Sequence, residues 1–139
     1  MRLGGPLFDQ ITDAASWVAS IKAHGYSAVY CPIGPEADDA MVQDYTNAAR
    51  ENNIVIAEVG AWSNPISPNE EERKTAIQKC QDLLAHADRM GALCCVNIAG
   101  SRSNKWDGPA ADNLSPETFD LIVETTRAII DNVNPVNPF

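Results

Sequence analysis

A single carboxylate, Glu58, lies inside an apolar stretch of the sequence at residues 54–62. The β-branched and small residues around it are typical of a strand buried on both faces in a parallel sheet, and the stretch ends in Gly-Ala-Trp at Trp62. Burial of an ionised group costs roughly several kcal/mol unless the group is paired. Glu58 is therefore expected either to have a partner, such as an arginine or backbone donors, or to lie near a strand end where a binding site opens.

Cysteine and histidine form no recognisable metal-binding pattern. The four cysteines are Cys31, Cys80, Cys94 and Cys95. None forms a Cys-x-x-Cys pair, so a zinc knuckle is not indicated, and their places in predicted strands and on a helix stripe are typical of buried free thiols in a reducing compartment. His24 and His86 fall near the ends of predicted helices, where a histidine is more often a surface residue near the helix C-terminus than a metal ligand.

Hydrophobic periodicity predicts the elements that must position these side chains. Strands are expected near residues 3–5, 28–31, 54–59 and 93–98, and helices at about residues 13–24, 37–51, 67–90 and 115–133. Ser67 and Ser115 are each followed by proline and are expected to cap the third and fourth helices. The last helix is expected to present a broad apolar face made by Phe119, Ile122, Val123, Thr126, Ile129, Ile130 and Val133.

Strict alternation of four strands and four helices predicts the fold class. It indicates a single α/β domain over residues 1–139, with a parallel sheet in the order 1-2-3-4, right-handed crossovers and helices on its outer face. No fifth strand follows the last helix, so the chain is expected to be the N-terminal half of a (β/α)8 TIM barrel.

The loops differ at the two edges of this predicted sheet. Connections from helix to strand are minimal, at residues 25–27, 52–53 and 91, whereas the connections from strand to helix are longer. The last two of these longer loops contain Trp62 and Trp106. This asymmetry predicts one working face, at the carboxyl ends of the strands.

The acidic composition excludes several classes of function. The net charge of −9 argues against a nucleic-acid surface, which needs basic side chains for phosphates, and against binding to an anionic membrane. The sequence has no apolar run of transmembrane length and no signal-peptide core at its start. A soluble, cytoplasmic protein is therefore expected.

Three motifs resemble the sugar phosphate isomerase/epimerase family, whose members are xylose isomerase-like (β/α)8 barrels. They are residues 56–62 (IAEVGAW), 96–102 (VNIAGSR) and 113–119 (NLSPETF). The resemblance covers essentially all of the chain but only the N-terminal half of such a protein. DNA-repair endonucleases of the same superfamily bind zinc through several histidines, but no predicted strand from the second to the fourth ends in histidine here.

The resemblance implies a metal-assisted reaction that this chain does not complete alone. Full-length relatives are expected to use Mn, Mg or Co, held by Glu, Asp, His and Glu at the ends of later strands, while two glutamates move a proton through an ene-diolate. None of those ligand positions falls within this sequence. We therefore assign no catalytic residue and no metal ligand, and expect the 139-residue chain alone to be inactive.

The part that this half could supply is one wall of a sugar-binding site. Trp62 and Trp106 could stack on a sugar ring, and Asn97 and the backbone near Gly100 could bond to hydroxyls or a phosphate. In the same way Glu58 is a candidate substrate-binding residue. The alternative is structural: tryptophans in loops often pack on their neighbours.

The basic residues Arg102 and Lys105 lie in the loop after the fourth predicted strand, where they could attract a phosphate. The alternative is that both are simply solvated. The sequence alone therefore leaves the phosphorylation state of the sugar open.

Two other functions remain as alternatives. The chain could be a non-catalytic sugar-binding or subunit module that retains only the half-barrel. A flavodoxin-like domain would need a phosphate-binding loop after the first strand, and residues 4–8 lack its glycine pattern. Because an open half-barrel has two sheet edges, a homodimer or association with a missing C-terminal half is expected.

Overall fold

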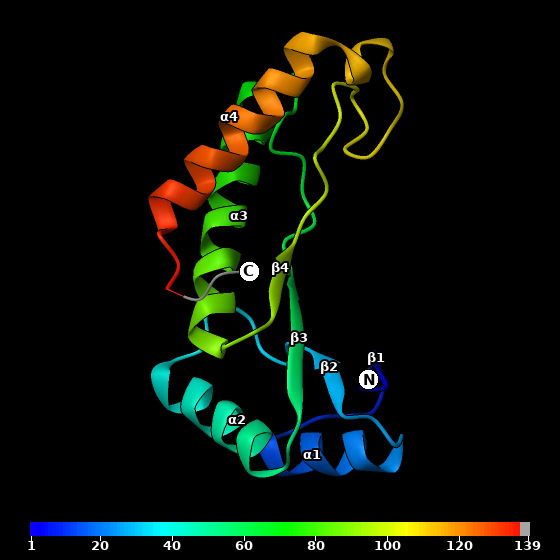
Figure 1. Cartoon of the computed structure of the whole chain (residues 1–139), viewed down its shortest axis with the longest axis vertical. Helices are drawn as coiled ribbons and strands as arrows, with labels where there is room; N and C mark the ends of the chain where they lie inside the picture. The colour runs from blue at the N-terminus through cyan, green and yellow to red at the C-terminus, as the bar shows by residue number, and fades with distance from the viewer. Residues whose placement is uncertain (137–139) are drawn as a thin grey trace. The chain divides into compact units, whose positions relative to one another are not determined.

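The computed structural model describes residues 1–136, in which strands and helices alternate as the sequence predicts (Figure 1). The strands are β1 (Gly4–Gly5), β2 (Ala28–Tyr30), β3 (Val55–Gly60) and β4 (Cys94–Val96). The helices are α1 (Ala14–Ala23), α2 (Asp39–Glu51), α3 (Glu70–Met90) and α4 (Pro116–Val133), with a short 3-10 helix, η1 (Ala111–Leu114), before α4. The last three residues of the expected 1–139 domain lie outside the described residues.

The strands form one sheet in the order β1-β2-β3-β4, which confirms the predicted order. β1 pairs in parallel with β2, and β2 pairs in parallel with β3. Between β3 and β4, Leu93 N donates to Ile56 O at 3.1 Å and Ala61 N donates to Val96 O at 2.8 Å. Because residue numbers rise in the same direction through both bonds, β4 also runs parallel, and the fold is of the α/β class.

One extra residue in β3 changes which of its side chains are buried. Consecutive residues of β2 pair with Ile56 and Glu58, so Ala57 between them forms a bulge. In an unbroken strand, Ile56 and Glu58 would face the same side of the sheet. With the bulge, Val59 joins Ile56 in the core instead, while Glu58 remains half-buried.

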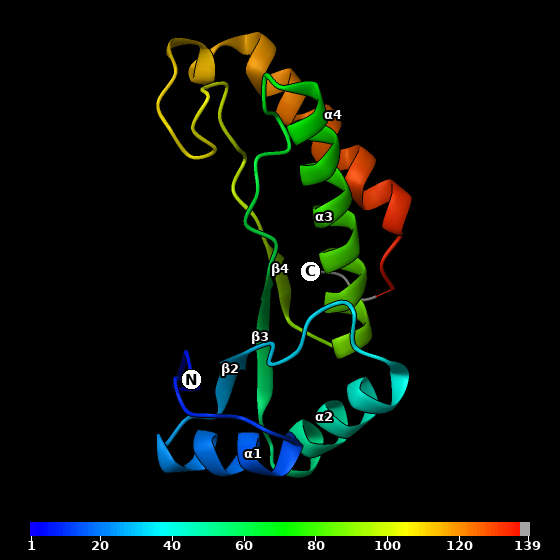
Figure 2. The ribbon, with the colours of Figure 1, turned by 180° about the vertical axis from the view of Figure 1, so that it is seen from behind.

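The chain divides into two compact units. Of the described residues, unit 1 comprises Met1–Val59 and His86–Cys95, and unit 2 comprises Gly60–Ala85 and residues 96–136. In unit 1, α1 and α2 lie side by side (Figure 2). Each unit has its own set of buried side chains.

The core of unit 1 forms between its helices and one face of the sheet. Trp17 of α1 is 1% exposed and contacts Tyr45 of α2 edge to face, with ring centroids 5.4 Å apart. Ile21 from α1 and Val29 from β2 are also buried. Aromatic pairs in this geometry stabilise a fold beyond the area that they bury.

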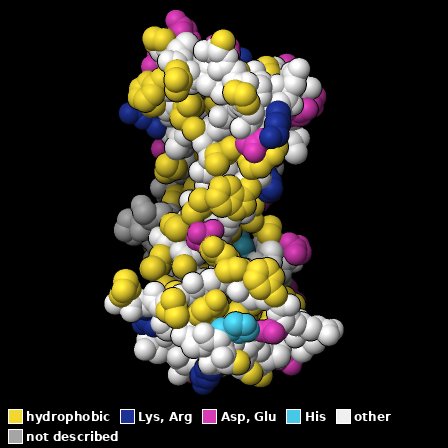
Figure 3. Space-filling view, turned by 90° about the vertical axis from the view of Figure 1, so that its right-hand side faces the viewer, with side chains coloured by type: hydrophobic (Ala, Val, Ile, Leu, Met, Phe, Trp, Pro, Cys, Tyr) yellow, Lys and Arg dark blue, Asp and Glu magenta, His cyan; other side chains and the backbone are white. Residues whose placement is uncertain are grey.

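The other face of the sheet in unit 1 is open within residues 1–136. Side chains of neighbouring strand residues point to opposite faces, and in β2 Val29 is 2% exposed whereas Tyr30 is 49% exposed. Leu93, next to β4, is exposed as well. Hydrophobic side chains are visible at the surface in Figure 3.

Helix ends in unit 1 follow the predicted local signals. Gly25, Asn53 and Gly91 each adopt a positive φ after a helix, where glycine and asparagine are the favoured residues. The Asp13 carboxylate accepts a hydrogen bond from the backbone of the first turn of α1 and caps it. Asp38 caps α2 in the same way, so α2 begins two residues later than predicted.

The start of α3 differs from the prediction, whereas the start of α4 confirms it. Asn69, not Ser67, caps α3: its Oδ1 accepts from Glu71 N at 3.0 Å and Glu72 N at 3.1 Å. The Ser67 hydroxyl accepts from Asn69 N instead and so stabilises the turn before the cap. Ser115 does cap α4, with proline in the first turn.

The buried face of α4 is narrower than the sequence indicates. The buried residues of α4 are Thr118, Thr125 and Ile129, which follow one another at helical spacing. Of the expected apolar face, Ile129 is buried, whereas Phe119 and Ile130 are exposed. Hydrophobic periodicity locates such a face but does not say how much of it is covered.

Substituting Trp17 with alanine is expected to lower the free energy of unfolding by about 3–5 kcal/mol, because it removes a buried indole and its contact with Tyr45. Urea denaturation followed by circular dichroism measures the change. Phe8→Ala is the control, since Phe8 is 89% exposed and its loss is expected to change stability by no more than about 0.5 kcal/mol. Similar losses in the two variants would contradict this description of the core.

Candidate functional site

Two loops of unit 2 follow the carboxyl ends of β3 and β4, at residues 61–69 and 97–115. A reciprocal pair of hydrogen bonds joins them: Asn64 Nδ2 donates to Ser101 O at 2.7 Å, and Asn64 Oδ1 accepts from Ser101 N at 2.9 Å. Both residues are buried. The side-chain amide of Asn64 thus satisfies backbone groups that would otherwise be buried without partners.

Gly100 is required for the two loops to approach each other. Its φ is +103°, a conformation that L side chains rarely adopt. A Cβ at this position would collide with Asn64 Oδ1 and would lie 2.7 Å from the Ile66 side chain. The residue predicted to offer its backbone to a ligand therefore has a structural role in joining the loops.

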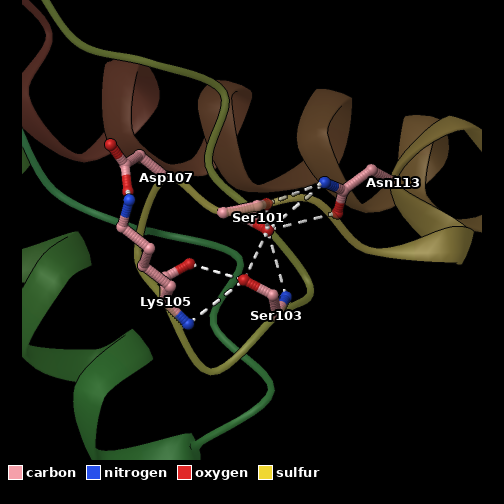
Figure 4. A network of polar contacts seen from close by, with 6 residues as sticks. Ser101, Ser103, Lys105, Asp107 and Asn113 are labelled. Carbon is pink, nitrogen blue, oxygen red and sulfur yellow. Dashed lines mark hydrogen bonds and ion pairs between the residues drawn. The ribbon is translucent and has the colours of Figure 1, made fainter.

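Ser101 is the centre of a polar network inside the second loop (Figure 4). Its hydroxyl donates to Gly108 O and accepts from Ser103 N at 3.0 Å and Asn113 Nδ2 at 3.3 Å. Asn113 Oδ1 in turn accepts from Arg102 N at 2.8 Å. These bonds fix the conformation of the loop without help from a ligand.

Asn97, a predicted substrate-binding residue, contacts neighbouring parts of unit 2. Its Oδ1 accepts from Ser63 N at 3.0 Å, and its Nδ2 donates to Cys80 Sγ at 3.3 Å. Ser63 Oγ also lies 3.2 Å from Cys80 Sγ. Burial raises the pKa of the Cys80 thiol, with the Ser63 hydrogen bond acting in the opposite direction, so Cys80 is a neutral partner in this cluster.

Trp62 and Trp106 are both half-exposed, at 49% and 46%. The Trp62 indole lies against the backbone of Gly60, because a Cβ on Gly60 would collide with Trp62 Nε1. Lys79 Nζ donates to Trp62 O at 2.9 Å and holds the Trp62 backbone. Each of the two tryptophans therefore offers an indole surface to solvent.

The basic residues of the second loop have partners within unit 2. Arg102 Nη1 donates to Ile66 O at 2.7 Å, so this guanidinium joins the two loops. Lys105 Nζ lies 3.3 Å from Asp107 Oδ1 in an exposed pair. An exposed pair of this kind contributes little to stability. The charge of Lys105 is thus partly balanced by Asp107.

Glu58 lies in unit 1, and within residues 1–136 its carboxylate has no hydrogen bond and no ion pair. The bulge at Ala57 keeps it out of the core, so it remains half-buried and reaches solvent. Of the two expectations for Glu58, a partner or a place near the end of its strand, the structure favours the second.

The two histidines differ from each other. His24 follows the prediction: it ends α1, and its Nδ1 lies 2.9 Å from Ser20 O. His86 was expected at the surface, but it is 1% exposed. Its Nε2 donates to Ile33 O at 3.0 Å. The prediction was wrong because burial of His86 depends on a carbonyl from a loop far away in the sequence.

A signal for this burial was present in the sequence. His86 stands four residues before buried Met90 and three after half-buried Leu83, so it shares a helix side with apolar residues.

No group of three or more His, Cys, Asp and Glu side chains among residues 1–136 could hold a metal ion. The residues present thus do not fit the divalent metal implied by the resemblance, which needs several convergent ligands. Cys31, Cys80 and Cys94 form no disulfide, and of these three only Cys80 is fully buried. No helix in the described part of the chain is long and apolar enough to cross a membrane.

Residues 18–136 match the family described as xylose isomerase-like TIM barrel. The four parallel strands and their helices agree with this match. The chain therefore belongs to the xylose isomerase-like TIM barrel family. No curated protein sequence matches it significantly.

Solved structures with the same fold include three sugar-converting proteins. The chain is similar to D-psicose 3-epimerase from Clostridium cellulolyticum H10, solved with D-tagatose, with a TM-score of 0.69 and 17% identity over 96% of this chain and 49% of that one. It is similar to 3-keto-D-glucoside 4-epimerase from E. coli, with a TM-score of 0.65 and 13% identity over 98% of this chain and 54% of that one. It is also similar to a putative xylose isomerase from Rhodospirillum rubrum, with a TM-score of 0.63 and 17% identity over 96% of this chain and 49% of that one.

At these identities the likeness describes the fold. The chain spans about half the length of the structures that it matches.

Substituting Asn64 with alanine is expected to lower the free energy of unfolding by about 2–4 kcal/mol, because the backbone N–H and C=O of Ser101 would be buried without partners. Thermal and urea unfolding measure the loss, and faster amide exchange at Ser101 locates it. Asn104→Ala is the matched control, since Asn104 is exposed and its side chain has no hydrogen bond within residues 1–136. A loss of similar size in the control would mean that the reciprocal bonds are not what joins the loops.

Proposed function

We propose that this chain is the N-terminal half of a sugar isomerase or epimerase and that it supplies part of the wall of the sugar-binding site. The observation that carries the proposal is the family match over residues 18–136, together with the sugar epimerases among the structures of similar fold. Active sites of this barrel architecture lie at the carboxyl ends of the strands, where both loops of unit 2 begin. A cytoplasmic location is part of the proposal.

The proposed substrate-binding residues are Glu58, Trp62, Asn97, Gly100 and Trp106. Half-exposed indoles suit the apolar face of a sugar ring. Asn97 keeps hydrogen-bonding capacity after its bonds to Ser63 and Cys80, since an amide group can make four. The unpaired Glu58 carboxylate could accept a hydrogen bond from a sugar hydroxyl. Gly100 contributes by allowing the loops to pack closely.

The proton-transfer chemistry is not assigned to this chain. Movement of a proton between adjacent sugar carbons needs groups that bind the developing oxyanion and groups that hold the proton. Residues 1–136 supply no metal-ligand cluster. We propose that the chain contributes to binding and that its missing partners complete the reaction.

A non-catalytic sugar-binding or subunit module is the second candidate. It is favoured by the same absence of a ligand cluster among the described residues. The reading frame beyond Phe139 separates the two candidates: further strands that end in Glu, Asp and His would support the isomerase, and a stop codon would support the module.

The purified chain is expected to bind a ketose weakly without converting it. D-Tagatose is a suitable probe, since a structure of similar fold was solved with it. Titration with Mg²⁺ present is expected to shift the indole NMR signals of Trp62 and Trp106 but not that of buried Trp17, because only the first two have exposed rings. Product analysis by chromatography is expected to show no epimerisation. Conversion of the sugar by this chain alone would contradict the proposed division of roles, and unchanged indole signals would contradict the binding wall.

The chain is also expected to associate, with a second copy or with a C-terminal half-barrel, through the open sheet face of unit 1. Tyr30 and Leu93 are exposed there, and the sheet edges are unpaired within residues 1–136. Light scattering coupled to size exclusion at micromolar concentration is expected to give a mass above the 15.0 kDa of one chain. The exposed substitution Tyr30→Lys is expected to reduce that mass, whereas Met41→Lys on α2 serves as a control. A sharp 15.0 kDa peak for the unmodified chain would contradict the expectation.

A further inference from the structure

His86 in α3 is the most deeply buried titratable side chain among residues 1–136, with 1% of its surface exposed. Its Nε2 lies 3.0 Å from Ile33 O. A carbonyl oxygen only accepts hydrogen bonds, so Nε2 carries the proton and the neutral ring is the Nε2–H tautomer. Nδ1 is then an acceptor, and it is buried without a hydrogen-bond partner among the described residues.

The carbonyl that His86 binds belongs to the loop between β2 and α2, at residues 31–38. Ile33 O also accepts from Cys31 Sγ at 3.3 Å, and Cys31 Sγ lies 3.5 Å from His86 Nε2. At the other end of the loop, Arg89 of α3 donates to Ala37 O at 3.2 Å. Two side chains one helical turn apart on α3 thus hold both ends of one loop.

A second proton on His86 would have no acceptor. It would place an N–H at Nδ1 and a positive charge inside the core, and an unpaired buried charge is strongly unfavourable. Arg89, on the same helix, adds repulsion, and its guanidinium is already paired with Asp39 at 2.9 Å. Glu36 in the loop favours the charged ring, but it is exposed and its effect is screened by solvent.

Cys31, whose sulfur lies 3.5 Å from the ring, cannot stabilise the charged ring either. Burial raises the pKa of the Cys31 thiol, so Cys31 faces His86 as a neutral group and not as a thiolate.

We propose that His86 is a pH-sensitive latch, which holds the loop at residues 31–38 against α3 when its ring is neutral and releases that loop when the ring is protonated. The inference uses only residues of unit 1 and does not depend on the proposed sugar-binding function. The loop connects the carboxyl end of β2 to α2. Its release would therefore make this connection less ordered without unfolding the sheet.

The direction of the pH dependence follows from burial. Burial lowers the pKa of His86 below its ordinary value of 6.5. The open state, in which the ring meets water, therefore binds the proton more tightly than the closed state. The closed loop is fully stabilised above pH 6.5, and this stabilisation is lost as the pH falls below that value.

Amide hydrogen exchange of residues 31–38 in the full chain measures the release. After correction for intrinsic exchange rates, lowering the pH from about 7.5 to about 5.5 is expected to increase loop opening by up to about tenfold, the limit set by an ordinary histidine in the open state. NMR titration of the His86 ring in the same samples is expected to have its midpoint where the loop exchange changes.

Two variants separate the latch from a general effect of acid. His86→Gln keeps an N–H donor for Ile33 O but does not titrate, so its loop opening is expected to be independent of pH. His24→Gln removes the other histidine and is expected to keep the pH dependence. The same pH dependence in His86→Gln, or none in the unmodified protein, would overturn the proposal. If His86→Gln fails to fold, a mismatch between the ring titration and the loop exchange in the unmodified protein would overturn it, and a match would support it.

Discussion

Parallel pairing of consecutive strands obliges every connection to return through a helix, and the rest of the structure depends on that constraint. All four strands then end at the same edge of the sheet. The strand-to-helix loops at this edge can vary in length and sequence, whereas the helix-to-strand loops at the other edge are short. Helix ends at Gly25, Asn53 and Gly91 make those short returns possible, since each adopts the positive φ that reverses the chain.

Polar side chains of the variable loops form hydrogen bonds with the neighbouring loop. In unit 2 the side chains of Asn64, Asn97 and Arg102 bind the backbone of the neighbouring loop rather than solvent. Such loops are ordered before any ligand arrives, which reduces the entropic cost of binding. The groups left over for recognition are few, chiefly the outer faces of the two half-exposed indoles.

Local signals predicted the helices, the strands and their order, because periodicity and capping residues act over a few positions. The candidate site was only partly predictable. Asn97 binds Ser63, 34 positions away, and Arg102 binds Ile66, 36 positions away, and no spacing rule identifies such pairs. The prediction for His86 was wrong for a related reason: a side chain becomes buried through the residues that pack on it, and a single sequence does not identify those residues.

The bulge at Ala57 has a consequence for how this gene can change. A substitution at codon 57 alters one small side chain beside the sheet. Loss of the same codon would remove the bulge and return the strand to strict alternation, with Glu58 still opposite Tyr30 and Val59 still on the core side with Ile56. The reading frame would survive, and the strand would keep the same side chains toward the core. At this position one codon can be lost without changing which side chains the strand buries.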